Sequence, residues 1–431
     1  MKYALVTFGC RVNQADSLEM EGALRERGGV QAPPAQADLV IVNTCSVTAH
    51  ADQGARQVVR KIARENPAAK IVVTGCYATR QPGELADLPG VLTVVPNDRK
   101  DQLVAALPWP TTTASRYAGG EGSCGAILRP GVAGRTAFTL RVQTGCDEHC
   151  SYCIIPNTRG AGRSRPLAWV LKAIDEAVDA GYKEIALCGV HLGSYGRDLP
   201  DGPSLADLVR CLSQWPSDVL FRISSLEPMD FTQELLEIVA TSVRIAPHFH
   251  LPLQHADDAM LRAMRRPYSA AAYEGLVSEI AAAMPDACIG TDLIAGFPGE
   301  TDAQADALAD RLERLPLAYV HVFPYSDRPG TEASGMTGKV AGGAIRARGA
   351  RLRAIGEEHA RRFRASQVGR VRRALVVDDG TSVVTDNYLK LTLADGPRTR
   401  NEWVDVRVEA PHLGRVMETS GVPLPLLGIE H

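Results

Sequence analysis

The sequence lacks any long uninterrupted hydrophobic run, and its first residues do not form a signal-peptide pattern. No run approaches the roughly 18 apolar residues that span a bilayer, so we expect no membrane partner and a cytoplasmic protein. Disulfides are rare in that reducing compartment. The ten cysteines are therefore expected to be metal ligands or ordinary buried thiols.

The chain also lacks a strong net charge, because 47 Lys and Arg face 50 Asp and Glu, a difference of −3. The distribution is uneven. Residues 346–373 hold ten Arg against two Glu, a local charge of +8, which predicts either a phosphate-binding face or a solvated helix surface. From residue 374 onward five Lys and Arg face nine Asp and Glu, a local charge of −4 that the sequence does not explain.

Residues 1–108 alternate short apolar strands with helical patterns. Strands are expected over KYALVTF, DLVIVNT and KIVVTG, and helices over residues 15–29 and 51–66. This alternation predicts a multidomain α/β chain that begins with a doubly wound parallel sheet. Residues 109–134, rich in Pro, Gly, Thr and Ser, predict a linker with at most one short strand, and Cys124 within it is assigned no role.

Residues 135–343 resume the alternation with six candidate strands. Six βα units are two short of a closed eight-fold barrel, so we expect an open, partial (β/α)6 barrel with its site at the carboxyl ends of the strands. A basic helix is expected over residues 344–366. Short β-like runs separated by Asp-Gly turns predict a small β-barrel over residues 367–431.

Three cysteines lie in the segment TGCDEHCSYC, just after the first strand of the second domain. Cys146, Cys150 and Cys153 can bind three corners of a 4Fe-4S cluster, which takes four ligands, so one iron would stay open to a substrate or cofactor. The alternatives are a zinc site with His149 as fourth ligand and a loop without metal. The spacing does not match the common zinc fingers.

Three further cysteines, Cys10, Cys45 and Cys76, each follow a predicted strand in TFGC, VNTC and VTGC. Parallel strands end at one edge of a sheet, so these residues are expected to meet although 35 and 31 residues separate them. Three unrelated buried thiols are the alternative. The shared position after a strand favours a second three-cysteine cluster.

The cysteine loop, with Tyr152 before its last cysteine, resembles the radical S-adenosylmethionine (SAM) superfamily. With the dispersed cysteines, nearly the whole chain resembles the radical SAM methylthiotransferases, whose C-terminal module is a small β-barrel called TRAM. RISSLEP (222–228), HLPLQ (250–254), TDLIAGFPGET (291–301) and HVFPYSDRPGT (321–331) support this. The resemblance implies two 4Fe-4S clusters as cofactors beside SAM, a catalytic role for the cysteine loop, and a SAM pocket lined by Tyr152, Gly189, Ser224 and Gln254.

The resemblance also implies a reaction. One SAM methylates sulfur held at the open iron of the Cys10, Cys45 and Cys76 cluster. A second SAM, bound at the loop cluster, is cleaved by one electron, and the resulting radical removes hydrogen from C2 of an adenine, which then takes the methylthio group. Such an enzyme needs an electron donor such as flavodoxin or ferredoxin.

Residues 9–17, GCRVNQADS, are similar to the G-C-K/R-V-N-Q form of the branch that acts on N6-threonylcarbamoyladenosine (t6A), at adenosine-37 beside the tRNA anticodon. CIIPNTRGAGRSRP (153–166) and TDNYLKL (385–391) also look like this branch. The alternatives are isopentenyladenosine tRNA and an aspartate of ribosomal protein S12. A third reading, of another class, is a non-catalytic RNA-binding protein with structural zinc.

The expected partner is thus the tRNA anticodon stem-loop. Arg159, Arg163 and Arg165, beside the cysteine loop, are expected to contact its phosphates. The chain departs from the family after HLPLQ, where His255 and Asp257 replace a Ser-Gly-Ser-Asp-like turn, and we expect His255 to be a loop residue without a special role. Three cysteines in strand or helix patterns are expected to be core thiols: Cys188, Cys211 and Cys288.

Overall fold

The computed structural model describes residues 1–46, 48–108, 136–200 and 202–417. The predicted linker, residues 109–134, and its Cys124 lie outside these ranges. The second domain is described from Thr136 onward. Within them, no helix combines the length and the apolar composition that a membrane crossing requires.

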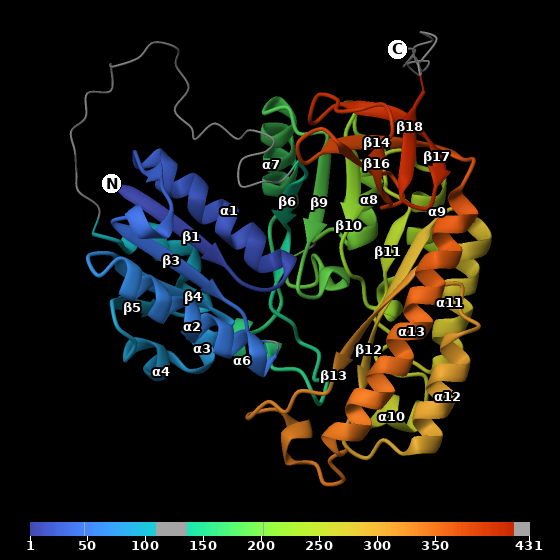
Figure 1. Ribbon diagram of the computed structural model, residues 1–431, viewed down its shortest axis with the longest axis horizontal. Coiled ribbons are helices and arrows are strands. Elements are labelled where there is room, and N and C mark those ends of the chain that lie inside the picture. The colour runs from blue at the N-terminus through green and yellow to red at the C-terminus, as the bar shows by residue number, and fades with distance from the viewer. Residues whose placement is uncertain (47, 109–135, 201, 418–431) are drawn as a thin grey trace.

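The N-terminal part is a five-stranded parallel sheet in the order β2-β1-β3-β4-β5 (Figure 1). Alternate residues of its central strands face opposite sides: Val40 and Val42 pack beneath one helix layer, and Leu39 and Ile41 beneath the other. The predicted doubly wound sheet is therefore confirmed. Its elements are β1 (Lys2–Thr7), α1 (Arg11–Glu26), β2 (Val30–Gln31), β3 (Leu39–Thr44), α2 (Ala49–Glu65), β4 (Lys70–Gly75), α3 (Cys76–Arg80), α4 (Pro82–Ala86), β5 (Val91–Val95) and α5 (Leu103–Ala106).

The central part is an open barrel of six parallel strands, as predicted. Two three-stranded sheets, β10-β9-β6 and β11-β12-β13, are joined by a parallel bridge between Phe221 and Ile245. One continuous apolar cluster fills the space between these strands and the helices outside them. The strands are β6 (Phe138–Arg141), β9 (Glu184–Cys188), β10 (Leu220–Ile223), β11 (His248–His250), β12 (Cys288–Ala295) and β13 (Tyr319–Pro324).

The helices of this part follow their strands in the order that the sequence predicts. Between β6 and β9 lie α6 (Ile155–Arg159), α7 (Leu167–Asp179) and a small antiparallel pair, β7 (Gln143–Thr144) with β8 (Arg163–Ser164). The others are α8 (Leu205–Ser213), α9 (Gln233–Thr241), α10 (Asp258–Ala263), α11 (Ala270–Ala283), α12 (Asp302–Leu312) and α13 (Gly342–Gln367). The last is the expected basic helix, and it runs beside β13 and α12.

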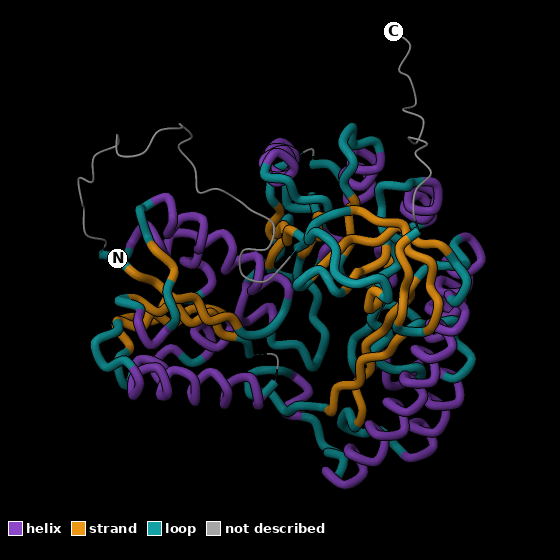
Figure 2. The backbone as a smooth tube through the Cα atoms, turned by 45° about the horizontal axis from the view of Figure 1, so that its top comes forward, coloured by secondary structure: helices purple, strands orange, loops and turns teal. Residues whose placement is uncertain are grey.

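The C-terminal part is a closed barrel in the order β14-β15-β16-β18-β17, consistent with a TRAM-like module. The segment SVVTDNYLKLTL, residues 382–393, forms two strands, and the chain turns between them at Tyr388, which has a positive φ of 73°. Figures 1 and 2 show the N-terminal sheet beside the central barrel. Figure 1 also shows the C-terminal barrel above the strands of the central barrel. The strands are β14 (Val371–Val377), β15 (Ser382–Thr385), β16 (Lys390–Leu393), β17 (Trp403–Ala410) and β18 (Leu413–Val416).

Candidate active site

The three dispersed cysteines lie at the carboxyl ends of three neighbouring strands. Cys10 follows β1 and caps the N-terminus of α1, Cys45 follows β3, and Cys76 follows β4 as the first residue of α3. Cys10 is exposed, whereas Cys45 and Cys76 are buried. The topology thus collects them at one sheet edge, as the strand-end pattern predicts.

Glycines with positive φ precede three of the six candidate ligands. A Cβ on Gly9 would lie 2.5 Å from the Sγ of Cys45, and one on Gly75 would lie 2.2 Å from the carbonyl oxygen of Thr44. A Cβ on Gly145 would lie 1.9 Å from the carbonyl oxygen of Ala161. These contacts are too short for any side chain, so each glycine lets the chain before its cysteine pass close to a neighbouring segment.

The loop cysteines surround a short turn after β7. The Cys146 amide donates to the carbonyl of Gly160, and the Cys153 amide donates to the carbonyl of Cys150, at 3.0 Å each. Burial raises the pKa of Cys153 to about 12. Burial also raises the pKa of Cys150, although the Arg266 guanidinium, 3.2 Å from its Sγ, opposes that effect. Iron binding must therefore displace protons from these thiols.

One cavity of about 820 Å³ is lined by Cys10 of the N-terminal set and by the three loop cysteines. Cys10 lines it from the N-terminal sheet, opposite all three loop cysteines. The four residues that the family resemblance assigns to the SAM pocket also line it: Tyr152, Gly189, Ser224 and Gln254. The cavity continues along the inside of the barrel to Tyr388 and Lys390 of the C-terminal part. A ligand in it can reach Cys10 and the three loop cysteines, whereas Cys45 and Cys76 do not line it.

The arrangement of the cysteine sulfurs can be compared with that around a single zinc ion. Thiolates around one tetrahedral zinc lie about 3.8 Å apart, given a Zn–S distance of about 2.3 Å. In the described part of the chain, just one group of three side chains has all its ligand atoms within 4.8 Å of one another: His250, Asp292 and His321. Neither cysteine set is that compact, and His149 is exposed. Neither set is therefore arranged around a single zinc ion.

A buried charge cluster holds the cysteine loop against the N-terminal sheet. The carboxylate of Asp16 on α1 forms ion pairs with Lys100, Arg159 and Arg141. The nitrogen–oxygen distances are 2.8, 3.0 and 3.2 Å, respectively. Burial alone would raise the pKa of Asp16, but these three cations hold it below its ordinary value. The prediction that Arg159 contacts RNA phosphates is wrong, because its guanidinium is buried in this cluster.

Two further side chains support the cysteine loop, and the sequence analysis did not single them out. The Nδ1 of His191 lies 3.8 Å from the Sγ of Cys146, and its Nε2 lies 2.6 Å from the Oδ2 of Asp230. Burial would lower the pKa of His191, but the hydrogen bonds to Asp230 and Cys146 raise it to about 10. The position of His191 just after β9 was a usable signal, since ligands gather at strand ends. Arg266, after α10, gave no such signal.

Several expected roles change with the structure. His255 lies in a loop, as expected, but its side chain is fully buried, with its Nε2 3.4 Å from Glu300. Asp257 caps α10 by accepting from the Met260 amide. Cys211 lies on the exposed face of the amphipathic helix α8 and is not a core thiol. Cys188 and Cys288 are buried, as expected, although both also line the large cavity.

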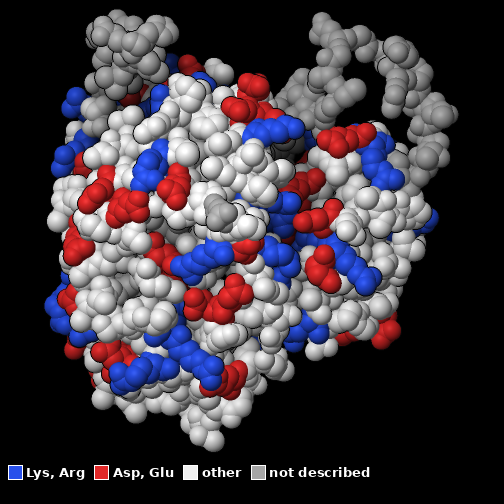
Figure 3. Space-filling model, turned by 180° about the vertical axis from the view of Figure 1, so that it is seen from behind, with Lys and Arg blue, Asp and Glu red and all other residues white. Residues whose placement is uncertain are grey.

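Much of the basic segment is neutralised within the molecule. On α13, Arg348 pairs with Glu300 and Asp302, and Arg351 pairs with Asp306 and Asp310. Arg165, beside the cysteine loop, pairs with Glu19 and stacks on Trp169. Figure 3 shows the face opposite that of Figure 1, and basic and acidic side chains are interspersed on it. Paired arginines of this kind make a weaker phosphate-binding surface than the local charge of residues 346–373 suggests.

Comparisons with known proteins agree with this geometry. Residues 2–96 match the uncharacterized protein family UPF0004, and residues 140–312 match the radical SAM superfamily. The threonylcarbamoyladenosine tRNA methylthiotransferase MtaB of Aquifex aeolicus is 34% identical over 91% of this chain and 96% of its own. The tRNA-2-methylthio-N(6)-dimethylallyladenosine synthase of a Parafrankia strain is 34% identical over 88% of this chain and 78% of its own.

Among solved structures, the radical S-adenosylmethionine methyltransferase TsrM of Kitasatospora setae is similar to this chain. It superposes with a TM-score of 0.54 at 16% identity, covering 77% of this chain and 73% of its own. At that identity the likeness concerns the fold alone.

Proposed function

The chain belongs to the radical SAM methylthiotransferase family, in the branch of the threonylcarbamoyladenosine tRNA enzymes, and we propose that it adds a methylthio group to C2 of t6A at adenosine-37. Each turnover consumes two SAM, one as methyl donor and one as radical source. The partners are the tRNA anticodon stem-loop and an electron donor such as flavodoxin or ferredoxin, and the enzyme works in the cytoplasm.

The observation that carries this proposal is the single cavity lined by Cys10 and by Cys146, Cys150 and Cys153. Transfer of a methylthio group requires the radical source and the sulfur donor to approach the same carbon. Cys10 of one proposed cluster site lines the same cavity as all three cysteines of the other, which meets that requirement, whereas structural metal sites need not share a cavity.

The residues present fit two 4Fe-4S clusters. Cys10, Cys45 and Cys76 would hold one, and the loop cysteines the other, and three thiolates would leave one iron of each cluster free for another ligand. When bound, the loop cluster supplies the electron that cleaves SAM, and the other cluster carries the sulfur that is transferred.

The chain's own side chains orient these parts. Arg266 donates to the Sγ of Cys150 and pairs with Glu227, so it places a positive charge beside the loop cluster. Tyr152, Gly189, Ser224 and Gln254 line the cavity beside that site and would position SAM.

Nucleoside mass spectrometry of tRNA from a deletion strain tests the substrate. Loss of the methylthio form of t6A supports the proposal. Loss of the methylthio form of isopentenyladenosine instead, or unchanged tRNA with an unmodified S12 aspartate, assigns the chain to the corresponding alternative substrate.

A Cys10→Ala variant tests the division of labour between the two sites. We expect it to cleave SAM after anaerobic reconstitution while making no methylthio product. Formation of product at the wild-type rate would remove the N-terminal cysteines from the reaction. Stoichiometric zinc in the reconstituted wild-type chain, in place of about eight irons, would end the radical mechanism.

A further inference from the structure

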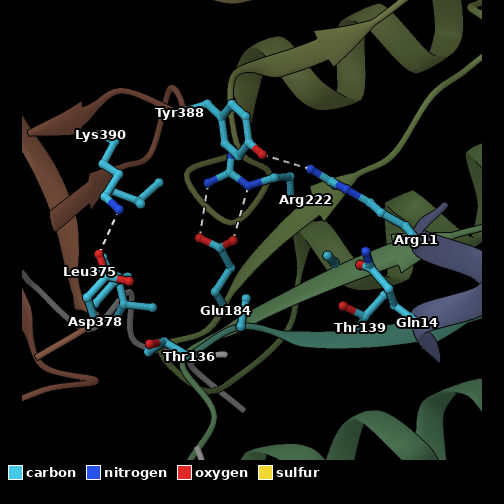
Figure 4. Close-up of a pocket in the computed structure, with 14 residues that line it drawn as sticks. Arg11, Gln14, Thr136, Thr139, Glu184, Arg222, Leu375, Asp378, Tyr388 and Lys390 are labelled. Carbon is cyan, nitrogen blue, oxygen red and sulfur yellow. Dashed lines mark hydrogen bonds and ion pairs between the residues drawn. The ribbon is translucent and has the colours of Figure 1, made fainter. Parts of the chain in front are cut away.

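Arg11 lies at the junction of all three parts of the molecule. It directly follows Cys10, and its side chain lines both the large cavity and a second one of about 430 Å³ (Figure 4). Its Nη2 donates to the hydroxyl of Tyr388 at 3.0 Å, and its Nη1 donates to the hydroxyl of Ser224 at 3.4 Å. Arg11 therefore touches the C-terminal barrel and the central barrel at once.

Arg11 differs from most cations in these cavity walls because it makes no ion pair in the described structure, and Arg364, which also makes none there, is exposed whereas Arg11 is half-buried. Arg159 is paired with Asp16, Arg266 with Glu227, and Lys390 with Asp378. Within the described ranges Arg11 makes no ion pair and bonds to neutral hydroxyls. A half-buried guanidinium without a counter-charge favours an anionic ligand, and its planar fork suits a carboxylate.

The proposed substrate supplies such a group. The threonylcarbamoyl substituent carries a carboxylate, is attached at N6 and lies beside ring atom N1. The reacting carbon C2 also neighbours N1, so the carboxylate and C2 occupy the same edge of the adenine. When C2 faces the sulfur-donating site, the carboxylate would lie beside that site. Arg11 is adjacent to Cys10, a ligand of the site, and supplies a cation there.

The position of Arg11 is fixed by a rigid partner. The ring of Tyr388 stacks on His248 with 4.1 Å between centroids, and the guanidinium of Arg222 lies 4.9 Å from its centroid. Arg222 is itself buried and bonded through two nitrogens to Glu184, as Figure 4 shows. The hydroxyl that holds Arg11 is thus anchored before substrate arrives, which lowers the entropic cost of binding.

We propose that Arg11 binds the carboxylate of the threonylcarbamoyl group and thereby selects t6A over adenosines with uncharged N6 substituents. The inference rests on the proposed function and deepens it by naming the residue that determines specificity. An RNA phosphate is a less suitable ligand, because Arg11 lies inside the cavity against the side chains of Ser224 and Tyr388.

The test compares two anticodon stem-loop RNAs, one carrying t6A and one carrying its neutral methyl ester, with the anaerobically reconstituted enzyme. We expect the wild type to prefer t6A by about tenfold to a hundredfold in kcat/KM, since charge-assisted hydrogen bonds have that strength. Arg11→Gln should lose this preference by losing activity on t6A, and Arg11→Lys should keep part of it. Arg364→Gln, a control cation on the same cavity wall without an ion pair in the described structure, should keep the preference.

Other outcomes overturn the inference. Equal losses of Arg11→Gln on both RNAs indicate a phosphate contact, and a raised KM for SAM indicates the carboxylate of SAM. Loss of preference in Arg364→Gln alone assigns the role to that residue. If the wild type modifies neither RNA, the proposed function fails, but the Kd values of the two RNAs for the same holoenzyme still test whether Arg11 reads the carboxylate.

Discussion

Arg159 of the central part lies 3.0 Å from Asp16 of the N-terminal sheet, between Nη2 and Oδ2, and both side chains are almost completely buried. Arg159 also donates to the hydroxyl of Thr144, at the start of the cysteine loop. The contact links α1, whose N-terminus is Cys10, with the loop that carries Cys146. The relative placement of the two thiol sets therefore depends on a buried ion pair.

Replacing Asp16 by Asn should strongly destabilise the chain. The change leaves the buried cations Lys100, Arg141 and Arg159 without their shared anion, and breaking a buried ion pair costs about 3–5 kcal/mol. Urea unfolding measures this loss. Glu19→Gln is the control, since Glu19 is partly exposed and should change the free energy of unfolding by about 1 kcal/mol or less. Equal effects of both substitutions would contradict the assigned importance of Asp16.

Gly75→Ala should abolish one cluster and spare the other. A Cβ at this residue would lie 2.2 Å from the carbonyl oxygen of Thr44, and φ is +103°, so the chain before Cys76 must move. We expect about four irons per chain after anaerobic reconstitution instead of about eight. Gly83→Ala, in α4 of the same sheet domain, meets no atom within 4 Å and should keep the wild-type iron content. Retention of about eight irons in Gly75→Ala would show that Cys76 is not a required ligand.

Arg266→Gln should make the loop cluster harder to reduce. The guanidinium places a positive charge and a hydrogen bond on the Sγ of Cys150, which favour the reduced, more negative cluster. Loss of an interaction of about 1.4 kcal/mol corresponds to about 60 mV for a one-electron couple, and a potentiometric titration followed by electron paramagnetic resonance measures it. Arg265→Gln is the matched control, because Arg265 is exposed and pairs with Glu332. A potential unchanged in Arg266→Gln would argue against this electrostatic role.

His191 should make the stability of the cluster-free chain depend on pH. Its pKa rises from an ordinary value of about 6.5 to about 10 in the folded chain, against the effect of burial, through hydrogen bonds to Asp230 and Cys146. The folded state therefore holds the proton more tightly, so this contribution is complete below about pH 6.5 and declines as pH rises toward about 10. Urea unfolding between pH 6 and 10 should show a steeper decline for the wild type than for His191→Gln. Parallel curves would contradict the pairing.

The sequence by itself determined the order of elements and the identity of the thiol ligands we propose. Strands such as KIVVTG are short, apolar and rich in β-branched residues, and their alternation with helices leaves few topologies besides parallel sheets. The shared position of Cys10, Cys45 and Cys76 after strands was sufficient to predict that they lie at one edge of the sheet, because parallel strands have a common carboxyl edge. These features could be predicted because each is visible within a short stretch of sequence: the pattern of apolar residues in a strand or helix, and a cysteine directly after a strand.

Only the tertiary structure decided what each charged side chain does. Arg159 and Arg11 look alike in the sequence, both beside a candidate ligand segment, yet one is buried against Asp16 and the other is bonded to hydroxyls of two other parts of the chain. Tyr388 reaches Arg11 across 377 residues of sequence. Burial and pairing are set by contacts between distant segments, and no spacing in the sequence encodes which cation will find a counter-charge.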